Sequence, residues 1–143
     1  MGTISENFSY REFEASDTAQ RLGIINAITD FGVRDSIKAL VLEVLQPLRD
    51  AWDKSLHINS GYRCPELNKI VGGTATSQHL KGEAADVACD DPLALAQLAY
   101  DLGLPYDQMI VYPDFVHFSH KLSGKQRRMV LYNKSWKGEH ITV

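Results

Sequence analysis

Alternation of apolar and polar positions predicts helices in the first third of the chain. Between Asp35 and Trp52, apolar residues recur at three- and four-residue steps, which is typical of an amphipathic helix with one buried face. Pro47 is expected to kink this helix or divide it. A shorter helix is predicted before it, capped by Ser16 or Asp17 and ending near Gly23.

The rest of the chain combines one more helix with several short strands. Asp91 as N-cap and Gly103 just beyond the end delimit a helix that starts with Pro92. The predicted strands are 57–59, 84–89, 108–112, 115–119 and 128–132. Because helices come first and strands cluster later, we predict an α+β fold with helices packed on one face of a small, mostly antiparallel sheet.

Composition narrows the classes of protein. The 143 residues, predicted to form one domain over 1–143, are 44% hydrophobic and 23% charged, with a formal net charge of -3. Nothing in this balance indicates a nucleic-acid partner, and no apolar run approaches the roughly 20 residues needed for membrane insertion. Cys64 and Cys89 lack CxxC spacing and are expected to be reduced. The first residues, MGTISENFSY, do not resemble a signal peptide.

An aspartate inside a small apolar strand is the first candidate for chemistry. Asp86 lies within Ala84–Ala88 and is costly to bury unless it is paired, hydrogen-bonded or bound to a metal. His79 lies seven positions earlier, with Gly82 between them to let the backbone turn back. The pair fits either a metal site or a structural hydrogen bond.

A histidine on another strand supplies a third donor. In Phe115–Ser119, alternation places His117 on one face of the strand with Phe115 and Ser119. Alone, such a histidine is typical of an ordinary core residue. Together with His79 and Asp86, it makes three protein ligands, the number that a catalytic zinc keeps while its fourth position takes water.

The motifs resemble a known family. The order S-G-Y-R, then G-G-T-x-x-S-Q-H-x-x-G-x-A-x-D, then F-V-H-F-S is similar to the zinc peptidases of the D-Ala-D-Ala carboxypeptidase family, the M15 type, which includes phage endolysins. The likeness runs from about Phe8 to Arg128. It implies a fold like that of this family, with His79, Asp86 and His117 as ligands of Zn²⁺ and Arg63 lining the substrate site.

Further side chains fit a role around such a centre. Arg63 could hold a substrate carboxylate or the developing oxyanion, unless it forms a structural ion pair. Ser77, Gln78 and Tyr112 are candidate substrate contacts. Lys125, Arg127 and Arg128 are more typical of a solvated hairpin edge, and Trp136 either contacts substrate or packs back on the domain.

The general base departs from the family pattern. Members commonly carry glutamate three residues before the last ligand, and this chain has Asp114 there. An aspartate can transfer the proton, although its carboxylate is one methylene shorter. It is equally typical of a turn after Pro113. Asp107, His57 and His120 are other candidate proton carriers, with weaker support from their spacing.

Three functions of different classes are compatible with these residues. The first is a zinc metallopeptidase that hydrolyses an amide bond of peptidoglycan stem peptides, as a D-Ala-D-Ala carboxypeptidase or an L-Ala-D-Glu endopeptidase. The second is a zinc-stabilised module that binds cell wall or protein without cutting, and a zinc-free structural protein of a phage particle is a third. We expect the protein to stay cytoplasmic until released, or to be phage- or virion-associated.

Overall fold

One long helix forms the base of the fold in the computed structural model, which describes residues 2–143. It comprises α3 (Phe31–Leu40), a π-helical turn η1 (Val41–Leu45) and α4 (Gln46–Trp52). Asp30 caps it by accepting a hydrogen bond from Val33 N, so it begins four residues before the predicted start. Pro47 has no N–H for an i−4 bond, and the π turn immediately before it lets the helix continue without a break.

The other helices are short. They are α1 (Tyr10–Glu14), α2 (Asp17–Leu22), α5 (Pro65–Ile70), the 3₁₀ turn η2 (Gln78–Lys81) and α6 (Pro92–Asp101). The predicted caps are confirmed: Ser16 accepts a hydrogen bond from Ala19 N, and Asp91 accepts one from Ala94 N. The pattern missed α1 and α5, which are too short to show a helical period.

Five strands form the main sheet. They are β3 (His57–Ser60), β4 (Ala84–Ala88), β5 (Gln108–Val111), β6 (Phe115–Ser119) and β7 (Met129–Tyr132), in the order β3-β4-β6-β5-β7. β1 (Thr3–Ser5) and β2 (Phe8–Ser9) form a separate pair. All pairings in the main sheet are antiparallel except that of β5 with β7, which is parallel.

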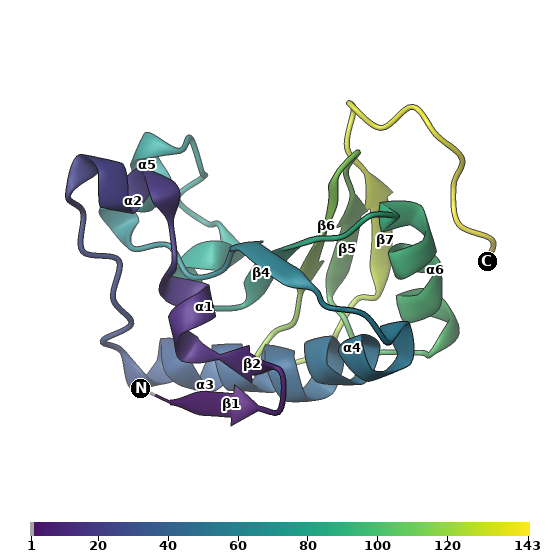
Figure 1. The fold of residues 1–143 in the computed structure, drawn as a ribbon, viewed down its shortest axis with the longest axis horizontal. Coiled ribbons are helices and arrows are strands. Elements are labelled where there is room, and N and C mark those ends of the chain that lie inside the picture. The colour runs from purple at the N-terminus through teal and green to yellow at the C-terminus, as the bar shows by residue number, and fades with distance from the viewer. Residues whose placement is uncertain (1) are drawn as a thin grey trace.

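Strand alternation gives the sheet two different faces. One face is apolar and fully buried, with Val87 of β4 paired to Val116 of β6, and Val116 paired to Val111 of β5. α3, α4 and α6 cover this face, as Figure 1 shows, and α6 contacts β5 and β6. This confirms the predicted α+β fold. α5 lies apart from these helices, as Figure 1 shows, whereas η2 contacts both α3 and α5.

Two expectations about composition can be compared with the described residues. Both cysteines are free thiols and half-buried. Over residues 2–143, no helix has the length and apolar character needed to cross a membrane.

Candidate metal centre and cavity

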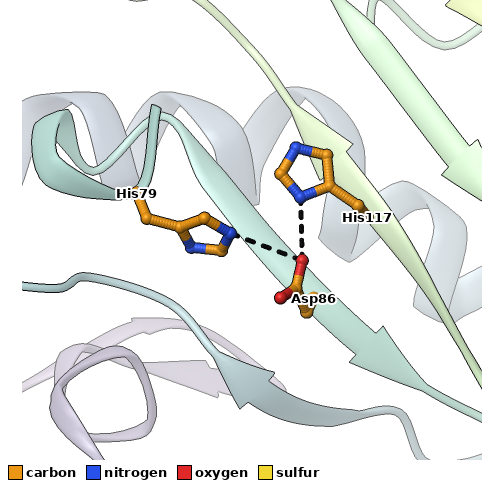
Figure 2. A group of neighbouring side chains, drawn as sticks. All are labelled: His79, Asp86 and His117. Atoms are coloured by element: carbon orange, nitrogen blue, oxygen red, sulfur yellow. Dashed lines mark hydrogen bonds and ion pairs between the residues drawn. The ribbon is translucent and has the colours of Figure 1, made fainter. Parts of the chain in front are cut away.

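The face of the sheet opposite the long helix carries the three predicted metal donors. Asp86 on β4 and His117 on β6 are cross-strand partners, so their side chains emerge side by side. η2 brings His79 to the same place, and Figure 2 shows the two rings converging on the carboxylate. Asp86 Oδ1 lies 2.8 Å from His117 Nδ1 and 3.4 Å from His79 Nε2. One ligand atom from each residue lies within 4.8 Å of the others.

A backbone carbonyl fixes the orientation of His79. Its Nδ1 lies 2.7 Å from Gly61 O, and since a carbonyl only accepts, this nitrogen must carry the proton. Gly61 can lie here because it has no side chain: a Cβ at this position would come within 2.6 Å of the Phe13 ring and 2.8 Å of Phe13 Cα. The neutral ring then presents a bare Nε2.

The bare nitrogen and the carboxylate are close enough to bind one metal ion. His79 Nε2 lies 3.4 Å from Asp86 Oδ1. Two imidazoles and one carboxylate are ligand types that zinc takes in catalytic sites. The donor set therefore fits a zinc ion.

Burial and hydrogen bonding act in opposite directions on Asp86. Burial alone would raise the pKa of its carboxyl, but the hydrogen bond from His117 and the adjacent His79 ring hold the pKa well below its usual range. The carboxylate is therefore ionised at neutral pH, as a metal ligand must be.

The centre lies in the wall of a cavity of about 770 Å³. Seven of the eight predicted site residues line it, namely Arg63, Ser77, Gln78, His79, Asp86, Tyr112 and His117. Arg63 and Asp86 also line an adjoining hollow of about 360 Å³, so the centre is accessible from two sides.

Arg63 has the features of a ligand-binding arginine. Its backbone N–H donates to His79 O at 3.1 Å, which ties it to the metal centre. Among the described residues, its buried Nε has no hydrogen-bond partner and its guanidinium forms no ion pair. Burial lowers the pKa of Arg63, while nearby Asp86 and Tyr112 raise it. The structure therefore does not support the alternative of a structural ion pair.

The predicted substrate contacts are engaged to different degrees. Ser77 Oγ accepts a hydrogen bond from His79 N at 3.3 Å and so caps η2. Gln78 Nε2 donates to Asp107 at 3.3 Å, and Gln78 also lines the cavity. Tyr112 stacks on Phe115 with ring centroids 4.1 Å apart, and burial raises the pKa of its phenol.

Asp114 lies away from the other predicted site residues. It is exposed in the turn between β5 and β6, which Tyr112 N closes by donating to Phe115 O at 3.0 Å. It is not among the residues that line the cavity. The turn conformation therefore directs this carboxylate to solvent.

All three residues of the basic run, Lys125, Arg127 and Arg128, are exposed, and the two arginines also have partners within the fold. Arg127 binds Asp107 through two guanidinium nitrogens, Nε at 3.0 Å and Nη2 at 2.7 Å. The Arg128 guanidinium lies 4.9 Å from the centre of the Tyr106 ring and donates to a backbone carbonyl. These aromatic and carboxylate partners are distant in sequence, so the local pattern did not indicate them.

The remaining candidates have other surroundings. Asp107 is fully engaged by its hydrogen bonds, His57 is exposed on β3, and His120 is buried, where desolvation lowers its pKa. None of the three lines the cavity. Trp136 packs against the core and donates from Nε1 to Glu139 O at 2.9 Å.

Asn26 is a site residue that the sequence did not reveal. Its amide donates to Glu14 O and Tyr62 O, and its oxygen accepts from Cys64 N at 2.7 Å. It thus holds both neighbours of Arg63. An asparagine in an irregular segment carries no sequence pattern for such contacts, because the partners come together only in the fold.

An α+β fold with a His, Asp, His centre in a wide polar cavity defines a metallohydrolase-like protein. The family profile described as Peptidase M15 matches residues 6–119, which is most of the chain. The chain belongs to this family, and the resemblance inferred from its motifs is confirmed.

A curated relative also matches. It is the zinc D-Ala-D-Ala carboxypeptidase of Streptomyces albus G, 32% identical over 125 residues, which cover 85% of this chain. The match covers 47% of that relative, so the chain spans about half of its length.

Proposed function

We propose that this protein is a zinc peptidase that hydrolyses an amide bond in peptidoglycan stem peptides. The observation that carries the proposal is the convergence of His79, Asp86 and His117 on one point of a cavity that also exposes Arg63. Family membership and the zinc D-Ala-D-Ala carboxypeptidase relative support the substrate class.

Zn²⁺ is the cofactor that fits these donors, and His79, Asp86 and His117 would hold it. When bound, it would supply a Lewis acid and lower the pKa of a coordinated water. The chain prepares its own ligands: Gly61 O fixes the tautomer of His79, and the two imidazoles keep Asp86 ionised.

Arg63 is placed to bind the anionic part of the substrate. Its charge is permanent at working pH, and its donors have few partners within the protein, so a carboxylate or a developing oxyanion in the cavity would find them free. Tyr112 lies near Arg63 in the same cavity and adds an aromatic wall and a hydroxyl.

Asp114 is proposed as the proton acceptor on its spacing alone, three residues before His117. From the exposed turn it would act through a water chain or after movement of the turn. Asp114→Asn should lower kcat about 100-fold or more without changing zinc content. Asp35→Asn, at an exposed position on α3, is the control. Unchanged kcat in Asp114→Asn would remove Asp114 from the mechanism.

The cleaved bond is the finer part of the proposal. The relative's name supports D-Ala-D-Ala, at the end of the stem peptide. The second hollow beside Arg63 and Asp86 supports an interior bond such as L-Ala-D-Glu, since substrate could extend past the centre in both directions. Mass spectrometry of muropeptides released from intact sacculi distinguishes them: loss of one D-Ala indicates the first, and a new amino end on D-Glu indicates the second.

Variants at the centre test the mechanism. His79→Ala and Asp86→Ala should lose both bound zinc, measured by atomic emission, and hydrolysis of sacculi. Hydrolysis by either variant in its metal-depleted form would refute a zinc mechanism.

A zinc-stabilised binding module is the second candidate. The placement of Asp114 outside the cavity favours it, because a binding site needs no general base. Zinc-loaded protein that sediments with sacculi but releases no new ends would support this function over the peptidase.

A further inference from the structure

A buried carboxylate organises one end of the cavity and takes no part in the proposed reaction. Asp107, immediately before β5, is completely buried. Its Oδ1 accepts from Arg127 N and Nε, both at 3.0 Å. Its Oδ2 accepts from Arg127 Nη2 at 2.7 Å and Gln78 Nε2 at 3.3 Å. These four bonds use the acceptor capacity of a carboxylate.

Lys121 lies beside this saturated group, and within residues 2–143 its Nζ forms no hydrogen bond. Its Nζ is 3.6 Å from Asp107 Oδ1, which is close enough for charge attraction but too long for a hydrogen bond. The ammonium is thus held in place while its three N–H groups stay available. About a third of the Lys121 side chain and half of the Arg127 side chain are exposed, and both residues line the cavity.

The cluster keeps a net positive charge. One carboxylate neutralises one of the two cations, so Asp107, Arg127 and Lys121 together carry one surplus positive charge. Hydrogen bonds from Arg127 hold the pKa of Asp107 well below its usual range, and the cluster stays in this charge state through neutral pH. Over the whole cavity, positively charged residues outnumber negatively charged ones. The lining includes the cations Arg63, Lys81, Lys121 and Arg127 and the anions Glu83 and Asp86.

Strand register places this cluster at one end of the site. His117 pairs with Ile110 of β5, in the middle of the sheet. Toward one end of β5, Gln108 follows directly after Asp107, and Gln108 pairs with Met129 of β7, two residues after Arg127. Toward the other end lies Tyr112, whose phenol is near the Arg63 guanidinium. The metal centre therefore lies between two cationic groups.

We propose that Lys121 and Arg127, positioned by Asp107, form a subsite for a second carboxylate of the substrate. Arg63 serves one end of the bound peptide, and this pair binds a side carboxylate at the other end. The inference rests on the proposed function. Stem peptides meet the requirement, because the α-carboxylate of D-Glu and the side-chain carboxylate of diaminopimelate are free unless amidated.

The test compares peptides that differ only in these groups. Zinc-loaded protein is assayed on synthetic stem pentapeptides with both side carboxylates free, with either one amidated, and with both amidated. Amidation of one of the two should lower kcat/KM about tenfold or more, because a charge-assisted hydrogen bond is lost. Lys121→Met should reduce cleavage of the free acid to the same extent and abolish the difference between acid and amide.

Lys125→Met is the matched control. Lys125 lies in the same connection between β6 and β7 but is exposed and does not line the cavity, so its variant should keep the wild-type preference. Calorimetric titration of the cleavage product, in acid and amide forms, should show the same dependence on Lys121 in binding.

The outcomes separate this inference from the proposed function. If neither amidation changes kcat/KM, or if the preference survives in Lys121→Met, the subsite is refuted while the peptidase function stands. If the wild type cleaves neither the four peptides nor intact sacculi, the proposed peptidase function itself is refuted.

Discussion

Gly82 offers a direct test of how the fold sets the spacing of the metal ligands. It ends η2 and precedes β4, so it forms the turn between His79 and Asp86, and its φ is +72°. A Cβ there would lie 2.6 Å from Val33 O, a backbone atom of α3. Gly103 has nearly the same φ, +67°, but a Cβ there would meet nothing within 4 Å.

The two glycines separate backbone strain from steric contact. An alanine held in the left-handed region destabilises the folded state by about 1–2 kcal/mol. Replacing glycine also lowers the conformational entropy of the unfolded chain, which offsets about 0.4–1 kcal/mol of that loss. Gly103→Ala should therefore lower the free energy of unfolding by about 1 kcal/mol. Gly82→Ala should lower the free energy of unfolding by the same amount plus about 1–3 kcal/mol, because the added Cβ forces η2 and α3 apart. The total loss should be about 2–4 kcal/mol.

Urea denaturation of the zinc-free proteins, followed by circular dichroism, measures both values. Competition with a chromophoric chelator adds the zinc affinity, which should fall about tenfold or more in Gly82→Ala, since the displaced turn moves His79, and stay unchanged in Gly103→Ala. Equal losses of stability in the two variants, within about 0.5 kcal/mol, would refute the proposed contact between η2 and α3.

Three further variants test other parts of the structure. Asn26→Ala should cost about 2–4 kcal/mol and raise KM with zinc content unchanged, because three backbone groups beside Arg63 lose their partner; an unchanged KM would contradict this role. Asp107→Asn should flatten the pH dependence of the free energy of unfolding. A carboxyl whose pKa is lowered in the folded state stabilises the protein above its unfolded pKa of about 4, and this contribution is lost as the pH falls from there toward the folded pKa. A free energy of unfolding that varies between pH 7 and pH 3 as in the wild type would contradict this role of Asp107. Phe118→Ala should cost about 3–5 kcal/mol in urea denaturation yet retain zinc in the folded protein, because Phe118 faces the core.

Local signals made much of the fold predictable. The caps at Ser16 and Asp91 act over a few residues, and their helices begin where expected. Alternation in β6 placed His117 and Phe118 on opposite faces, as observed. In contrast, the parallel pairing of β5 with β7 could not be predicted, because it depends on how residues 112–128 return along the sheet, and no local pattern encodes that path.

The same limit separates the metal donors from their surroundings. His79, Asp86 and His117 belong to motifs with fixed spacing, so the sequence brought them together. Asp107 and Lys121 have no such spacing, and their role depends on a contact with Gln78 and Arg127 across the cavity. From the sequence, Asp107 was a candidate proton carrier only, and its burial and its partners became apparent in the fold.

The core and the metal centre are set by one register. β4 and β6 form five consecutive pairs in which core pairs such as Val87–Val116 alternate with the ligand pair Asp86–His117. A slip of one residue by β4 would turn Asp86 toward the long helix and expose Ala85 and Val87, at the cost of burying a charged group among apolar ones. The free energy that selects the correct core packing therefore also selects the correct ligand geometry. A short strand pair can thus hold two metal donors accurately without any covalent support.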